Sequence, residues 1–166
     1  MRGATVLAAP LKALLAACEK MGIEASTLFE AASVSASALD DPSARLSLEE
    51  AARMWAVALQ LTEEPLIGLQ AAQALPPGAY RVLDYLVANS PTVRAAYHRV
   101  SDYSRIIDSA CSIEISEGPD EVVCAMRHAL FPAGLPRPYV ECNFAVVALR
   151  SNVLWGFGFE ALRRGG

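Results

Sequence analysis

The chain has 166 residues, of which 54% are hydrophobic and 19% are charged, and its formal net charge is −4. This length is typical of one domain. An acidic chain with no basic run beyond Arg163-Arg164 is expected to bind nucleic acid poorly by itself, because binding requires several neutralised phosphates. No apolar stretch approaches the roughly 20 residues of a membrane-spanning helix, so we expect a cytoplasmic protein. The hydrophobic excess over the usual roughly 45–50% indicates either a larger core or a pocket or subunit interface in addition to the core, and we favour the second explanation.

The N-terminal region is predicted to be helical. Apolar residues recur at spacings of three and four over residues 5–21, which is typical of an amphipathic helix, and Gly22 ends that helix. Ser26 is placed to cap a second, short helix over Thr27–Ala32.

Polar residues and prolines mark the starts of the following helices. Ser47-Leu48-Glu49-Glu50 is a capping box, in which Ser47 is the N-cap residue and Glu50 reaches back to it. Pro65 opens the next helix, because a residue in the first turn needs no N–H bond. A further helix is expected over about residues 79–88, and Ser90 caps its successor, with Pro91 at the first helical position.

After Asp108 the hydrophobic period changes from 3.6 to 2, which predicts a strand. A turn at Gly118-Pro119-Asp120 and a second alternating segment complete a β-hairpin. The pairs expected across this hairpin are Ile113 with Cys124 and Cys111 with Met126.

A long helix is predicted from Pro138 to about Trp155. The order of elements indicates an α+β fold that is mostly helical, with the hairpin, a small antiparallel sheet, packed between late helices. A hairpin alone is marginally stable in water, and nothing strand-like follows the long helix. We therefore expect residues 1–166 to form a single domain of a longer protein.

Several short segments occur in the order and spacing of a known family. They are Gly22-Ile23, Asp41-Pro42-x-x-Arg45, Leu61–Leu69, Tyr85–Val93, Tyr103–Ile107 and Glu141-x-x-Phe144. Over about Gly22 to Gly156 the chain resembles the ligand-binding N-terminal domain of AraC-type bacterial transcription regulators, in the helical branch that has no cupin barrel. Asp84 departs from the family pattern, in which a glycine is common before the Tyr85 segment.

The resemblance implies an effector-sensing and dimerisation domain, which a DNA-binding domain with two helix-turn-helix motifs follows in the family. The implied partners are a small-molecule effector and a second copy of the chain, forming a homodimer. DNA would be bound through the C-terminal domain and not directly by this segment, which would need no membrane.

Aromatic residues occur in the predicted helices before and after the hairpin and in the loop that follows it. Tyrosine combines an apolar ring with a hydroxyl that orients a ligand. With the resemblance, these residues predict a cavity for a small, mostly apolar molecule with one polar or acidic end, which basic side chains would hold. For any one tyrosine, the alternative is a place in the core. The predicted ligand-binding residues are Tyr97, Tyr103, His128, Phe131, Tyr139, Phe144, Arg105 and Arg127.

An enzyme would require a nucleophile with a base, two poised carboxylates or a metal site. The two histidines, His98 and His128, are far apart in the sequence, Asp102 and Glu141 have no evident mate, and the four cysteines form no CxxC pair. We therefore expect no catalytic residue, no metal and no cofactor, and we expect the cysteines to be reduced, buried thiols.

A second hypothesis explains the apolar excess without a ligand. The chain would then be a pure dimerisation or protein-interaction module. In that case Leu149, Val153, Leu154 and Trp155 of the long helix would face a second chain.

Overall fold

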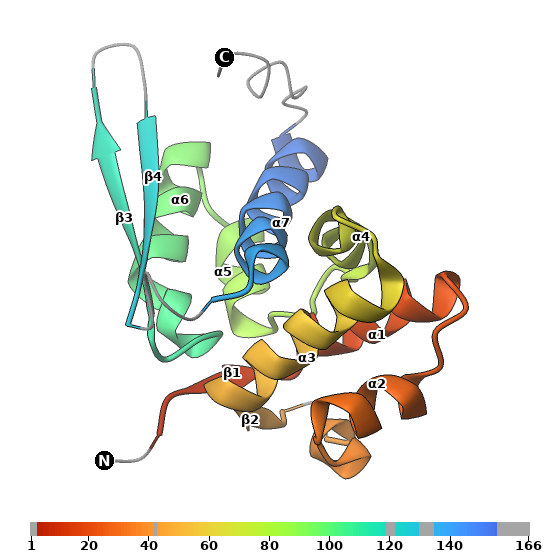
Figure 1. Cartoon of the computed structure of the whole chain (residues 1–166). Helices are drawn as coiled ribbons and strands as arrows, with labels where there is room; N and C mark the ends of the chain where they lie inside the picture. The colour runs from red at the N-terminus through yellow and green to blue at the C-terminus, as the bar shows by residue number, and fades with distance from the viewer. Residues whose placement is uncertain (1–2, 42, 119–121, 130–134, 156–166) are drawn as a thin grey trace.

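The computed structural model describes residues 3–41, 43–118, 122–129 and 135–155, with side chains as far as Ser151 (Figure 1). The helices are α1 (Ala9–Lys20), α2 (Ala25–Ala32), α3 (Leu48–Thr62), α4 (Ile67–Ala74), α5 (Val82–Ala88), α6 (Val93–Tyr103) and α7 (Arg137–Trp155), with 3-10 turns η1 (Ala36–Leu39) and η2 (Ser104–Ile106). The strands are β1 (Thr5–Leu7), β2 (Arg45–Ser47), β3 (Cys111–Glu117) and β4 (Val122–His128). The predicted α+β, mostly helical class is confirmed.

Helix α7 joins two groups of elements (Figure 1). On one side α1, α2, α3 and α4 pack around a core that includes the fully buried side chains of Leu11, Leu14, Leu28, Met54, Trp55 and Ile67. On the other side α5 packs on α6, and α6 packs on the β3–β4 hairpin. Because α7 contacts both α3 and α4 of the first group, it lies where the second group meets the core.

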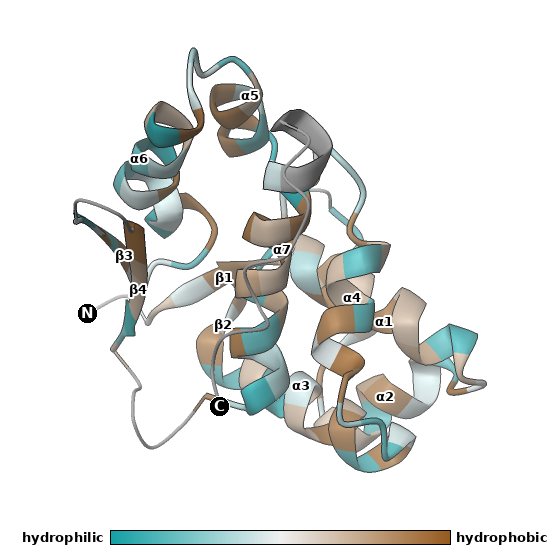
Figure 2. Ribbon diagram, turned by 90° about the horizontal axis from the view of Figure 1, so that it is seen from above, coloured by the Kyte–Doolittle hydropathy of each residue, from teal (hydrophilic) through white to brown (hydrophobic). Residues whose placement is uncertain are grey.

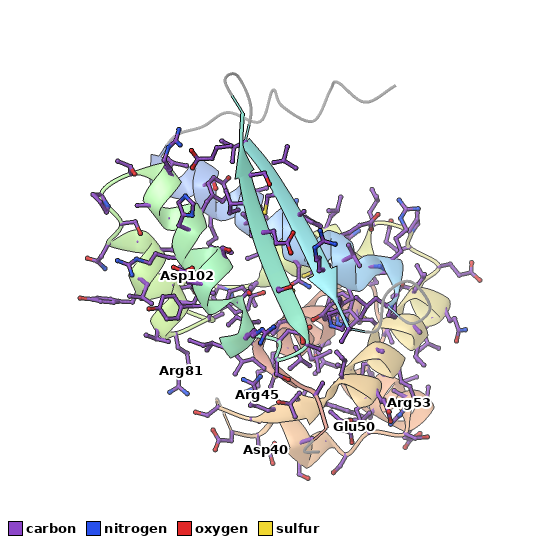
Figure 3. All side chains as sticks on the ribbon, turned by 90° about the vertical axis from the view of Figure 1, so that its left-hand side faces the viewer. Asp40, Arg45, Glu50, Arg53, Arg81 and Asp102 are labelled. Carbon is purple, nitrogen blue, oxygen red and sulfur yellow. The ribbon has the colours of Figure 1, made fainter. Side chains whose placement is uncertain are left out.

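Strand β1 ties the N-terminus to the start of the hairpin. It pairs antiparallel with β2 and forms a β-bridge between Val6 and Asp108. Arg45 strengthens the same junction (Figure 3), donating through Nε to Thr5 Oγ1 at 2.9 Å and through Nη1 to the Ile106 carbonyl at 2.6 Å. The segment that leads into β3 is therefore held by residues from the other end of the chain.

The prediction of a helix over residues 5–21 is wrong at its start. Residues 5–7 form β1, and α1 begins at Ala9, with Pro10 in its first turn, where a missing N–H costs little. The partner of β1 is the distant strand β2. A spacing pattern within one segment cannot reveal such a non-local pairing.

The predicted helix starts are confirmed where the signal is local and reciprocal. Ser47 Oγ accepts from the Glu50 N–H at 3.2 Å, and the Ser47 N–H donates to Glu50 Oε2 at 3.0 Å, which is the predicted capping box. The single-residue signals were wrong, because Glu24 rather than Ser26 precedes α2 and Thr92 rather than Ser90 caps α6.

The hairpin is confirmed, but its predicted register is wrong by two residues. Ile113 lies opposite Met126, Cys111 opposite His128 and Ile115 opposite Cys124. The connection is longer than the predicted turn, since Glu117 and Val122 are the last pair. A shift of two residues keeps every side chain on its predicted face, because the side-chain period of a strand is two.

Candidate functional site

A cavity of about 80 Å³ lies among α5, α6, the hairpin and α7. The elements around it carry hydrophobic stretches (Figure 2). One water needs only about 10–15 Å³, whereas pockets for drug-sized ligands span about 300–1,000 Å³. This cavity therefore suits a small molecule or one part of a longer one. Its apolar lining includes Leu83, Val87, Ala96, Val100, Ile107, Ile113, Met126, Phe144, Val146 and Val147.

Tyr80 is part of the cavity wall, and its buried hydroxyl is an unsatisfied polar group. Tyr80 is only 8% exposed, and its hydroxyl has no hydrogen-bond partner among the described residues. Burial, with a smaller contribution from nearby Cys142, raises the pKa of Tyr80, so the phenol keeps its proton. A buried donor without an acceptor costs roughly 1–3 kcal/mol, which a bound molecule with an acceptor atom would offset.

An ion pair lies on the same wall. Arg150 Nη2, from α7, lies 3.3 Å from Asp84 Oδ2, from α5, and the two side chains are only 18% and 15% exposed. The Tyr80 N–H donates to Asp84 Oδ2 at 3.0 Å, and Arg150 Nη2 donates to the Pro76 carbonyl at 2.9 Å. Asp84 and Arg150 therefore place two opposite charges in the cavity wall.

A buried polar network borders the cavity at Asp108, which lines it. Asp108 Oδ2 lies 2.9 Å from His128 Nε2 and accepts the hydroxyl of Tyr139, while Asp108 Oδ1 accepts the Ala110 N–H at 2.9 Å. Burial and the adjacent Asp108 carboxylate raise the pKa of Tyr139, which remains a hydrogen-bond donor. The Tyr139 ring also meets Trp55 edge to face, with centroids 6.1 Å apart. The network thus connects the cavity with the core.

The predicted site residues separate into three groups. Tyr97 and Phe144 line the cavity, and the Tyr97 hydroxyl lies 2.9 Å from Ser151 Oγ. His128 and Tyr139 lie behind the wall, where they contact it through Asp108.

The remaining predicted residues are not part of the wall that the structure describes. Tyr103 and Arg105 are exposed, Arg127 is exposed and paired with Glu114 at 2.7 Å, and Phe131 falls outside the described residues. The structure adds Tyr80, Asp84, Asp108 and Arg150 to the wall, and none of them is among the predicted ligand-binding residues. Asp84 and Arg150 could have been found from the sequence, because each is a charged residue within an apolar helical stretch.

An outer groove of about 360 Å³ adjoins the cavity. It shares Asp84, Val87, Val146 and Arg150 with the cavity, and its other walls come from α4 and the segment that follows it. Leu149, which the dimerisation hypothesis placed at an interface, lines this groove, whereas the side chains of Val153, Leu154 and Trp155 fall outside those described.

The buried cysteines predict a loss of stability at alkaline pH. Burial raises the pKa of Cys18 to about 11 and the pKa of Cys111 and of Cys142 to about 12. In the unfolded chain these thiols release their protons at about pH 8.5. The folded state therefore holds more protons than the unfolded state between about pH 9 and pH 12, and the free energy of unfolding falls as the pH rises through this range.

Urea unfolding at pH 8 and at pH 10.5 measures this fall. Cys142→Ala should be less stable at pH 8 but lose less stability on going to pH 10.5, because one of the titrating groups is absent. An equal loss in the wild type and in Cys142→Ala would contradict the role of the buried thiol.

Comparison with known proteins shows the family to which the chain belongs. The family model described as the arabinose-binding N-terminal domain of AraC transcription regulators matches residues 22–163, a range that contains every residue of the cavity wall. The ornithine utilization regulator of Pseudomonas aeruginosa (strain PAO1) is 32% identical over 104 residues, which cover 63% of this chain and 31% of that relative. The described helices are each too short or too polar to cross a membrane, and the described residues contain no group of three or more potential metal ligands. The chain belongs to the family of N-terminal regulatory domains of AraC-type transcription regulators, which is not a family of enzymes.

Proposed function

We propose that this domain senses a small, mostly apolar effector for a cytoplasmic transcription regulator, and that the effector binds in the cavity among α5, α6, the hairpin and α7. The observation that carries the proposal is a cavity wall that is mostly apolar but carries a few polar groups, among them the Asp84–Arg150 pair. Such a wall offers hydrophobic burial for most of a ligand and a specific partner for one polar atom.

The lining also bears on which molecules fit. Arabinose, for which the family is named, carries a hydroxyl or ring oxygen on every carbon, and ornithine, in the name of the relative, carries three charged groups at neutral pH. The side chains of Leu83, Val100, Ile113 and Met126 satisfy none of these groups, and burying an unsatisfied polar group costs several kcal/mol. The wall therefore favours a molecule with an apolar body and one polar end.

Binding would act through the elements that meet at the cavity. A ligand in contact with α5, α6, β3, β4 and α7 stabilises the arrangement that it fits, by its difference in affinity between that arrangement and others. We propose that the change reaches a helix-turn-helix domain beyond residue 166, which binds the DNA, and a second copy of this domain in a homodimer. We further propose that the whole regulator binds DNA.

Thermal unfolding with a panel of probes tests the proposal. The panel contains straight-chain carboxylates from butanoate to decanoate, their primary amides and alcohols, L-arabinose and L-ornithine. A ligand at 100 times its dissociation constant stabilises the folded state by about 2.7 kcal/mol, which raises the Tm of a domain this size by about 5–10 °C. We expect such a rise with amphiphilic members and little change with arabinose or ornithine.

Labelling of Cys124 provides a second readout, because this partly buried thiol lines the cavity. A bound probe should slow its reaction with iodoacetamide and leave Cys18, among the N-terminal helices, unchanged. No rise in Tm and no protection with any member of the panel would contradict the proposed function.

A further inference from the structure

We infer that Arg150 selects an effector that carries a carboxylate, which its guanidinium group holds at the junction of the cavity and the outer groove. The inference rests on the proposed function and adds the chemical class of the ligand and the residue that recognises it. Arg150 takes the role that the sequence predicted for Arg105 and Arg127, since neither of these two residues lines the cavity.

Arg150 has donors to spare at this junction. A guanidinium group carries five N–H donors, and within the described residues only Nη2 of Arg150 is engaged, by the Pro76 carbonyl at 2.9 Å and by Asp84 at 3.3 Å. A charge-assisted N–H···O bond is normally about 2.7–2.9 Å long, so the contact with Asp84 is loose. Nε and Nη1 remain available for the two oxygens of a carboxylate.

The other polar groups of the wall decide the sign of the ligand's charge. Both oxygens of Asp108 already accept hydrogen bonds, from His128, Tyr139 and the Ala110 N–H. Asp84 is paired with Arg150 and accepts the Tyr80 N–H. The Tyr80 hydroxyl and the Nε and Nη1 groups of Arg150 are donors with no hydrogen-bond partner among the described residues. An anion complements the donors of Arg150.

The two hollows also fit the shape of such a molecule. Arg150 and Asp84 line both the cavity of about 80 Å³ and the groove of about 360 Å³. A carboxylate at Arg150 would leave its apolar tail in the cavity, and a larger acid would place its remaining part in the groove. The effector class is thus a carboxylate with an apolar body.

The test compares octanoate with octanamide and octanol, which share its tail. In the wild type we expect octanoate to bind at least about tenfold more tightly than octanamide, because hydrogen bonds to charged groups contribute about 1.5–3 kcal/mol. In Arg150→Met the affinity for octanoate should fall at least about tenfold, and the affinity for octanamide should change less than about threefold. Arg99→Met is the matched control, since Arg99 is exposed and forms no ion pair in the described part of the chain.

Asp84→Asn provides a second test of the inference, which can be carried out even if Arg150→Met fails to fold. Removal of the competing carboxylate should tighten octanoate binding several-fold and leave octanol unchanged. Equal binding of octanoate and octanamide in the wild type, or unchanged or weaker octanoate binding in Asp84→Asn, would overturn the inference and leave the proposed function standing. If octanoate does not bind but another member of the panel does, the inference about the carboxylate is likewise overturned and the proposed function stands. If no member of the panel binds, the proposed function itself is contradicted.

Discussion

Asp108→Ala is expected to lower the free energy of unfolding by about 4 kcal/mol, because it leaves buried hydrogen-bond donors without their acceptor, at roughly 1–3 kcal/mol for each donor. The carboxylate is 4% exposed and the His128 side chain is fully buried. Without Asp108, the Tyr139 hydroxyl and the Ala110 N–H lose their acceptors in the interior, and the His128 ring loses one of its contacts. Urea unfolding at neutral pH measures the loss.

Asp102→Ala is the matched control for this substitution. Asp102 lies exposed on α6 (Figure 3) and forms no hydrogen bond or ion pair with the described residues. Its removal should change the stability by less than about 0.5 kcal/mol, as is usual for surface positions. Asp108→Asn should fall between wild type and Asp108→Ala, since its amide keeps one acceptor oxygen but adds a donor. If Asp108→Ala and Asp102→Ala proved equally stable, the network would not hold the hairpin to the core.

Gly68→Ala is expected to lower the free energy of unfolding by about 3 kcal/mol, near the upper end of the usual cost of overpacking. Gly68 lies in α4, where α4 packs on α7. A Cβ atom on Gly68 would lie 2.9 Å from Pro138 Cα and closer still to the Pro138 carbonyl oxygen. Since these are backbone atoms, α4 or the start of α7 must move. Alanine favours a helix over glycine by about 1 kcal/mol, so the clash must exceed this gain.

Gly3→Ala separates the clash from the general effect of adding a methyl group, because a Cβ on Gly3 would meet no atom within 4 Å. We expect Gly3→Ala to match the wild type in thermal unfolding and Gly68→Ala to unfold about 6–12 °C lower, at roughly 2–4 °C per kcal/mol for a domain of this size. A Gly68→Ala variant as stable as the wild type would show that α4 and α7 are not packed backbone to backbone.

The predictable parts of the fold were those written in short stretches of sequence. The Ser47 capping box and the alternation of β3 each depend on neighbouring residues, and both were found. Strands β1 and β2 were missed because they exist only through their pairing with each other. The hairpin register depended on the length of the turn, which the sequence between Glu117 and Val122 left open.

The site was harder to predict for the same reason. Tyr97 and Phe144 were found because aromatic residues are frequent in pocket walls. Tyr80 and Asp84 acquire their roles only because α7 brings Arg150 beside α5, and no local pattern predicts that approach. A charged residue within an otherwise apolar helical stretch, such as Arg150 after Val146–Leu149, is the signal that would have pointed to the wall.

The most direct test of the central claim is to fill the cavity and measure binding. Ala96 is 2% exposed and lines the cavity, whereas its neighbour Ala95 does not line it. Isothermal titration with the tightest-binding member of the probe panel should give a dissociation constant at least about tenfold higher for Ala96→Met, since displacing even part of the buried apolar contact costs more than 1.4 kcal/mol. Ala95→Met should bind as the wild type does. Equal binding by all three proteins would contradict the claim that the effector occupies this cavity.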